Sequence, residues 1–163
     1  MADKVSIRGF LDYFTPRAKV GGGKTSNPPP AYQDGYSMGA VGQVATEANL
    51  KQMAINYQGE NWQNYYNRTK KWLGRRVWDC NGLAEGYYKD RTGISINTKA
   101  RLNYANWCGK KSPTAKDTSL TGLPQVAGVA VFSGKTASSI SHVGFLLRKN
   151  GPGPLDWDVL ESK

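Results

Sequence analysis

Three strand-like segments, close together near the end of the chain, constrain the fold more than any other feature. They span residues 126–132, 141–148 and 157–162, and are separated by a short turn at 133–135 and a glycine- and proline-rich turn at 150–154. Apolar runs bounded by such turns are typical of neighbouring antiparallel strands. Because helical patterns precede them, we expect an α+β fold, with helices first and an antiparallel sheet afterwards.

The helical patterns lie upstream, at residues 46–57 and 60–73. In the first, apolar residues recur at helical spacing, Thr46 suits a helix N-cap and Gly59 suits a helix end. The residues expected on one face are Leu50, Met53, Ala54 and Tyr57. The second pattern is rich in aromatic residues, which we interpret as core rather than as the wall of a cleft. Further on, a short helix is expected near 98–107 within a loop-like segment.

Residues 1–35 differ in composition from the rest of the chain. Glycine and proline triplets at 21–23 and 28–30 cannot hold a helix or a central strand, so the segment is predicted to be an arm or linker. Residues 36–163 are then expected to form one domain, and the two cysteines are too few for a disulfide framework. The first residues lack the apolar core of a signal peptide, and no apolar run reaches membrane-spanning length.

The chain is strongly basic, with 22 Lys and Arg against 12 Asp and Glu and a formal net charge of +10. Such an excess indicates a polyanionic partner, because Lys and Arg neutralise phosphates and other anionic groups. Nucleic acid and an anionic cell-wall polymer both satisfy this pattern, and so does a basic surface that only contacts solvent. Charge alone does not choose among them.

One of the two cysteines lies where a nucleophile is expected. Cys80 follows the apolar pair Val77-Trp78 and Asp79, and it precedes a helix-like run at 82–88. Backbone N–H groups at the start of a helix have no intrahelical partner, and their positive field favours thiolate over thiol. We therefore expect Cys80 to have a lowered pKa and to act as a nucleophile.

The only histidine, His142, begins the second strand-like segment and is expected to act as the base for Cys80. An imidazole also needs a third group to fix its tautomer. If the second and third strands are neighbours, Glu161 lies one strand over from His142, with Asp156 and Asp158 as alternatives. One histidine and two distant cysteines do not make a zinc site, so we expect no metal ion and no cofactor.

At these residues the chain resembles a known family. The run Asp79-Cys80-Asn81-Gly82-Leu83 is similar to the Asp-Cys-Ser-Gly-Leu motif of the NlpC-type papain-like cell-wall peptidases, and residues 140–145 resemble their Ser-His-Val-Gly strand. Residues 128–132 stand where the family has Pro-Gly-Asp-Leu-Val-Phe, and 159–161 match the strand that supplies the third polar residue. In order and approximate spacing, the match covers about residues 45–163.

The resemblance implies a papain-like cysteine peptidase fold, with N-terminal helices and the nucleophile at a helix start packed on an antiparallel sheet. It implies a peptidase or amidase that cleaves peptidoglycan stem peptides, with Cys80 as nucleophile, His142 as base and Glu161 as the orienting group. The residues expected to contact the substrate are Trp78, Asp79, Asn81 and Ser141. Anionic wall polymers are the expected further partner, and nucleic acid is not expected.

The helical lead-in at 46–76 is similar to NlpC-type modules at the N-termini of phage or prophage endolysins. A protein of that kind is made in the cytoplasm and, without a signal peptide, reaches the cell wall by another route. The chain stops two residues after Glu161, where such domains generally continue through another strand, so we expect a domain shortened at its C-terminus.

Asn81 and the abrupt end of the chain support an alternative hypothesis. Asn81 replaces the usual serine after the cysteine, and the chain stops two residues after Glu161, which itself stands where the family more commonly has His, Asn or Gln. The alternative is a catalytically inert module with the papain-like shape that binds peptidoglycan or serves in phage assembly. The sequence does not specify the bond that is cut, the host or the oligomeric state.

Overall fold

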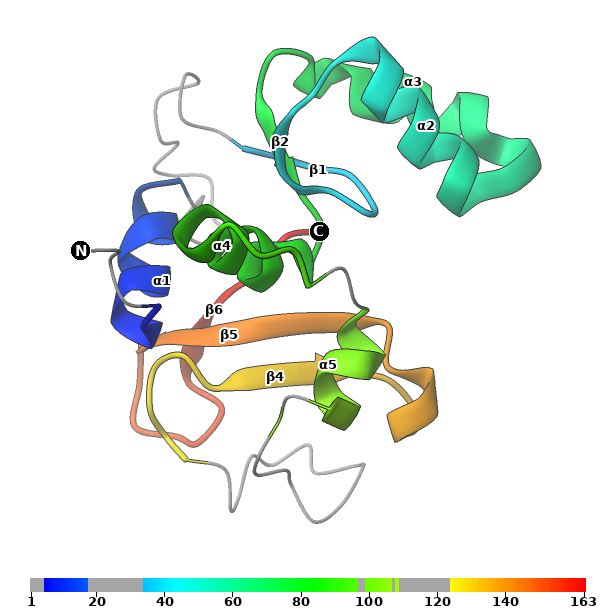
Figure 1. The fold of residues 1–163 in the computed structure, drawn as a ribbon. Coiled ribbons are helices and arrows are strands. Elements are labelled where there is room, and N and C mark those ends of the chain that lie inside the picture. The colour runs from blue at the N-terminus through cyan, green and yellow to red at the C-terminus, as the bar shows by residue number, and fades with distance from the viewer. Residues whose placement is uncertain (1–4, 18–33, 97–98, 107, 109–123) are drawn as a thin grey trace.

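The structure is a computed structural model that describes residues 5–17, 34–96, 99–106, 108 and 124–163 (Figure 1). Its helices are α1 (Ile7–Phe14), α2 (Glu47–Gln58), α3 (Trp62–Thr69), α4 (Gly82–Thr92) and α5 (Ala100–Asn106). Its strands are β1 (Gly35–Tyr36), β2 (Val41–Val44), β3 (Arg76–Trp78), β4 (Ala130–Ser133), β5 (His142–Lys149) and β6 (Trp157–Leu160). Short 3₁₀ turns are η1 (Thr15–Arg17), η3 (Gly59–Asn61), η4 (Lys70–Trp72) and η5 (Ala137–Ser139). Among these helices, none is long and apolar enough to cross a bilayer.

The strands form two three-stranded sheets, and α4 lies between them (Figure 1). In the first sheet β3 is central, parallel to β1 and antiparallel to β2. The second sheet has the order β4-β5-β6 and is antiparallel throughout. The α+β class and the three C-terminal strands expected from the sequence are confirmed. The first sheet was not expected, because its strands are too short to show a period in the sequence.

Helix α2 has the ends that its sequence predicts. The Thr46 hydroxyl accepts a hydrogen bond from the Asn49 backbone N–H (3.2 Å), and the Asn49 side chain accepts one from the Thr46 N–H (2.9 Å). This capping box satisfies donors that the first turn leaves without a partner. Gly59 ends the helix at a φ of 51°, where a residue with a Cβ is strained. Leu50, Met53 and Ala54 are buried as expected, whereas Tyr57 is half exposed.

The segment predicted as an arm contains a helix of the core. Phe10 and Phe14 of α1 are buried, and they pack with Trp78, Leu83 and Leu160. The prediction followed the glycine and proline triplets, which lie outside the described residues. It gave too little weight to the i, i+4 spacing of the two phenylalanines, which puts both rings on one face of a helix.

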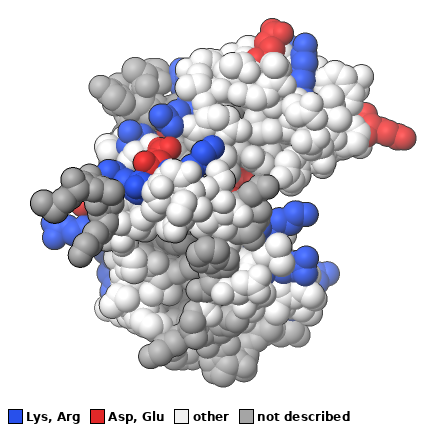
Figure 2. All heavy atoms as spheres, viewed as in Figure 1, with Lys and Arg blue, Asp and Glu red and all other residues white. Residues whose placement is uncertain are grey.

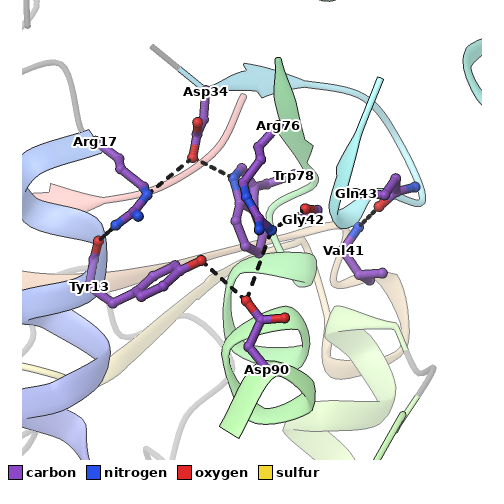
Figure 3. A network of polar contacts seen from close by, with 9 residues as sticks. All are labelled: Tyr13, Arg17, Asp34, Val41, Gly42, Gln43, Arg76, Trp78 and Asp90. Carbon is purple, nitrogen blue, oxygen red and sulfur yellow. Dashed lines mark hydrogen bonds and ion pairs between the residues drawn. The ribbon is translucent and has the colours of Figure 1, made fainter. Parts of the chain in front are cut away.

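Polar contacts hold α1 against α4 and the first sheet (Figure 3). The Tyr13 hydroxyl donates to Asp90 of α4 (3.2 Å), whose carboxylate also lies 4.0 Å from the Arg76 guanidinium of β3. Asp34, just before β1, accepts from the Trp78 indole N–H (2.8 Å) and pairs with Arg17 (3.9 Å). Arg17, at the end of η1, and Asp34 are therefore joined beside Trp78.

Helix α4 approaches the backbone before and within β2 more closely than side chains would allow. A Cβ built on Gly82 would lie 1.9 Å from the Ala40 carbonyl oxygen, and one on Gly86 would lie 2.4 Å from that of Val41. Real Cβ atoms do not come this close to backbone, so both positions need glycine. The i, i+4 glycine pair thus sets how α4 sits, and with it the residues just before the helix.

Candidate active site

Cys80 lies between the end of β3 and the start of α4, as the sequence predicts. Cys80 is 8% exposed and packs with Ala100 and Val143. The thiol contacts the backbone on both sides of His142: its Sγ lies 4.0 Å from the Ser141 carbonyl oxygen, and it accepts a hydrogen bond from the Val143 N–H. The cysteine and the first residues of β5 are therefore brought together across the two sheets.

The environment of Cys80 opposes ionisation, contrary to the expectation of a lowered pKa. Burial raises the pKa of the thiol, and the neighbouring Asp79 carboxylate raises it further. Backbone N–H groups of Val143, Asn81 and Cys80 itself act in the opposite direction but do not outweigh burial. The expectation of a lowered pKa considered the positive field at the start of a helix. It could not include the loss of solvent around the thiol, because burial depends on tertiary packing.

His142 and Glu161 meet as the strand order predicts. The His142 Nε2 lies 2.7 Å from Glu161 Oε2, and both side chains are partly exposed. Burial acts to raise the pKa of Glu161, but Lys163 and His142 outweigh it, and the pKa is lowered. The carboxyl is therefore ionised near neutral pH and accepts a hydrogen bond from the imidazole.

The two alternative carboxylates have other partners. Asp158 pairs with Arg148 through a 2.6 Å contact, and Asp156 accepts from the Gly153 N–H at 2.7 Å in the turn before β6. The structure therefore selects Glu161 from the three acids considered as the partner of His142.

Asp79 caps the start of α4 with its carboxylate. It accepts hydrogen bonds from the N–H groups of Gly39 (2.8 Å), Gly82 and Asn81. Burial raises the pKa of this carboxyl, and the three N–H donors limit the rise. These contacts give Asp79 a structural role beside Cys80, and the predicted contact with substrate remains a prediction.

Two residues expected to contact substrate are buried instead. Trp78 is 2% exposed and lies in the core, edge-on to Phe14 with ring centroids 4.9 Å apart. Asn81 is 4% exposed, and its side chain donates to Glu85 (2.7 Å) and accepts from Asn103. The Trp78 side chain is covered by α1, whereas the Asn81 side chain, held by Glu85 and Asn103, lines a cavity beside α4. Ser141 is exposed, and its carbonyl group faces the Cys80 thiol.

Residues that the sequence did not single out also shape the site. Asn103 and Glu85 hold Asn81 and thereby connect α5 and α4 next to Cys80. A cavity of about 300 Å³ adjoins them, lined among others by Phe10, Tyr87, Phe132, Val143 and Phe145. It lies between α1, α4, α5 and the second sheet, and it is mainly apolar. The i, i+4 spacing of Asn81 and Glu85 is the one sequence signal for this contact.

No cluster of three or more His, Cys, Asp or Glu side chains suited to a metal ion occurs within the described ranges. Cys80 and Cys108 are both free thiols. The chemistry that this arrangement offers is that of a thiol, an imidazole and a carboxylate.

Comparisons with known proteins add nothing to this geometry. No family model, no curated protein and no solved structure matches the chain. The assignment of a function therefore rests on the side chains at the site.

Proposed function

We propose that this protein is a papain-like cysteine peptidase or amidase that cleaves an amide bond of peptidoglycan stem peptides. The observation that carries the proposal is the pairing of His142 Nε2 with Glu161, directly beside the backbone that contacts the Cys80 thiol. A thiol, an imidazole and an orienting acid in this order are what acyl transfer to a cysteine requires. The similarity of residues 79–83 and 140–145 to the NlpC-type motifs supplies the substrate class.

Glu161 fixes the proton of His142 on Nε2, so Nδ1 is the ring nitrogen that acts as base. Because burial favours the neutral thiol, the proton leaves Cys80 for the imidazole as the sulfur attacks the amide carbon. A carbon–sulfur bond forms, the carbon–nitrogen bond breaks, and the imidazolium returns the proton to the departing amine. Water then hydrolyses the thioester and releases the acid.

The tetrahedral intermediate carries a negative oxygen that needs hydrogen-bond donors. We assign this role to the backbone N–H of Cys80 with a neighbouring donor, at the junction before α4, where the positive end of the helix also favours an anion.

The basic surface suits a substrate embedded in anionic wall polymers. Lys and Arg outnumber Asp and Glu on the face shown in Figure 2, in keeping with the net charge of +10. Binding to walls is then expected to weaken as salt rises, because exposed charges are screened. A wall-lytic module of a phage or prophage endolysin is a kind of protein that needs both a hydrolytic site and a basic surface that binds anionic walls.

The test is lysis of purified cell walls by Cys80→Ala and, separately, His142→Ala, with Cys108→Ala as the matched control. The first two variants are expected to lose lysis, and the control is expected to keep the rate of the parent. Mass spectrometry of the fragments released from defined peptidoglycan identifies the bond that is cut. Equal lysis by all variants would refute the proposal.

The alternative of an inert peptidoglycan-binding or phage assembly module is favoured by one observation, the burial of Cys80, which raises the pKa of its thiol. It predicts that the parent binds walls but releases no fragments, and that Cys80→Ala binds as tightly as the parent. Fragment release by the parent, abolished in Cys80→Ala, decides against it.

A further inference from the structure

The three residues that follow β6 each make a different contact next to the candidate site. Glu161 pairs with His142 through Oε2, as described above. The Ser162 hydroxyl donates to the Trp78 carbonyl oxygen at 3.0 Å, and the Lys163 ammonium pairs with Glu161 Oε1. Both oxygens of the carboxylate are thus engaged, and the backbone next to it is fixed to β3.

The Ser162 contact matters because the two halves of the site belong to different sheets. Cys80 lies two residues after Trp78 at the end of β3, whereas His142 begins β5 and Glu161 directly follows β6, both in the other sheet's part of the fold. The distance from thiol to imidazole therefore depends on how the sheets are joined. Figure 1 places the C-terminus of the chain close to the end of β3, where the Ser162 hydrogen bond is made.

Apolar packing alone does not define this junction sharply. Leu160 is buried against Trp78, but such contacts are non-directional and permit small displacements. A hydrogen bond from Ser162 to a main-chain oxygen is directional and acts one residue from Glu161. A displacement of about 1 Å between reacting groups costs about 100-fold in rate.

We propose that Ser162 and Lys163 are positioning residues of this site: Ser162 joins the end of β6, beside Glu161, to the end of β3, two residues before Cys80, and Lys163 holds the Glu161 carboxylate. Neither residue touches the reacting atoms. For its hydrolytic readout this inference rests on the proposed function, but its spectroscopic and labelling readouts do not.

The first test is Ser162→Ala, with Ser162→Thr as the variant that keeps the hydroxyl. We expect kcat for wall hydrolysis to fall about 10- to 100-fold with KM within about twofold, and Ser162→Thr to recover most of the loss. Ser162→Cys, which is similar in size and a weaker donor, takes the place of the alanine variant if that variant does not fold.

The matched control is Ser6→Ala. The Ser6 hydroxyl caps α1 by accepting from the Gly9 N–H at 3.0 Å, so its loss lowers stability through a helix that packs with Trp78 and Leu160 but leaves the Ser162 hydrogen bond in place. If Ser6→Ala and Ser162→Ala lower kcat equally at matched loss of thermal stability, Ser162 is only structural and the inference is overturned.

The second test is Lys163→Met, with Lys163→Arg as the rescue and Lys149→Met as the control. Lys149 lies at the far end of β5 and contacts the Gly153 carbonyl oxygen. Because Lys163 lowers the pKa of Glu161, the carboxyl carbon signal of Glu161 is expected to titrate at higher pH in Lys163→Met. Lys163→Arg and Lys149→Met are expected to titrate like the parent; an unchanged titration in Lys163→Met would overturn this part.

Two readouts remain informative even if the parent hydrolyses no wall. His142 is the only histidine, so its ring nitrogen signals are unambiguous in NMR spectra, and Ser162→Ala is expected to speed exchange of the Nε2 proton. Peptide mapping after iodoacetamide treatment is expected to show slower Cys80 labelling in Ser162→Ala than in the parent. Unchanged exchange and labelling would overturn the inference, whereas absent hydrolysis in the parent with both changes present would refute only the proposed function.

Discussion

The prediction with the largest expected effect concerns Phe14, because it tests whether α1 belongs to the core. The ring is 2% exposed and meets Phe10, Tyr13 and Trp78 with centroids 5.2, 4.9 and 4.9 Å away. Truncation to alanine removes about 130 Å² of buried apolar surface, worth about 3 kcal/mol at about 25 cal/mol per Å². The cavity and the lost edge contacts bring the expected loss of unfolding free energy to about 3–5 kcal/mol.

Urea unfolding followed by tryptophan fluorescence measures this change. With a slope of about 2 kcal/mol per molar, Phe14→Ala is expected to unfold at a midpoint about 2 M lower than the parent. Phe14→Leu fills most of the space and is expected to lose less, so it remains measurable if the alanine variant does not fold.

Arg8→Ala is the matched control on the same helix. Its side chain is 93% exposed and pairs with Asp12, itself exposed, at 3.7 Å, so a change of at most about 0.5 kcal/mol is expected. If Phe14→Ala changes stability as little as Arg8→Ala, α1 is not part of the core, and the packing described for Trp78 and Leu160 is wrong.

Two further predictions concern the helix that follows Cys80 and the thiol itself. Gly86→Ala is expected to lower the free energy of unfolding, measured with urea, by about 1–3 kcal/mol. The added Cβ would lie 2.4 Å from the Val41 carbonyl oxygen, and the cost of this clash exceeds the gain of about 1 kcal/mol in helix propensity. A more stable variant would contradict the close approach of α4. Because burial raises the pKa of Cys80, its iodoacetamide labelling is expected to keep rising with pH above the ordinary thiol value of 9.0, and a plateau below about pH 8 would contradict this.

Features with a local cause could be predicted from the sequence. Thr46 and Gly59 mark the ends of α2 because capping and a positive φ depend on single residues. The strands of the second sheet follow from apolar runs and turns, and their adjacency is enough to bring His142 to Glu161.

Features that depend on distant packing could not be predicted. Strands β1 to β3 have two to four residues, and β3 pairs with β1 and β2 across the intervening α2 and α3. Trp78 is an aromatic residue beside a cysteine, and nothing local distinguishes a cleft wall from the core position that it occupies against Phe14. The pKa of Cys80 likewise depends on burial, which the sequence of 77–88 does not contain.

The contact of Gly82 and Gly86 with the carbonyl oxygens of Ala40 and Val41 has a consequence for protein engineering. With no side chain between the two backbones, any substitution that shifts the turn at 37–41 shifts the start of α4 as well. Random libraries selected for a changed rate of the proposed wall hydrolysis should therefore accumulate changes in this turn, about 40 residues before the cysteine in sequence. Substitutions in the turn can thus shift the position of Cys80 without replacing Cys80 itself.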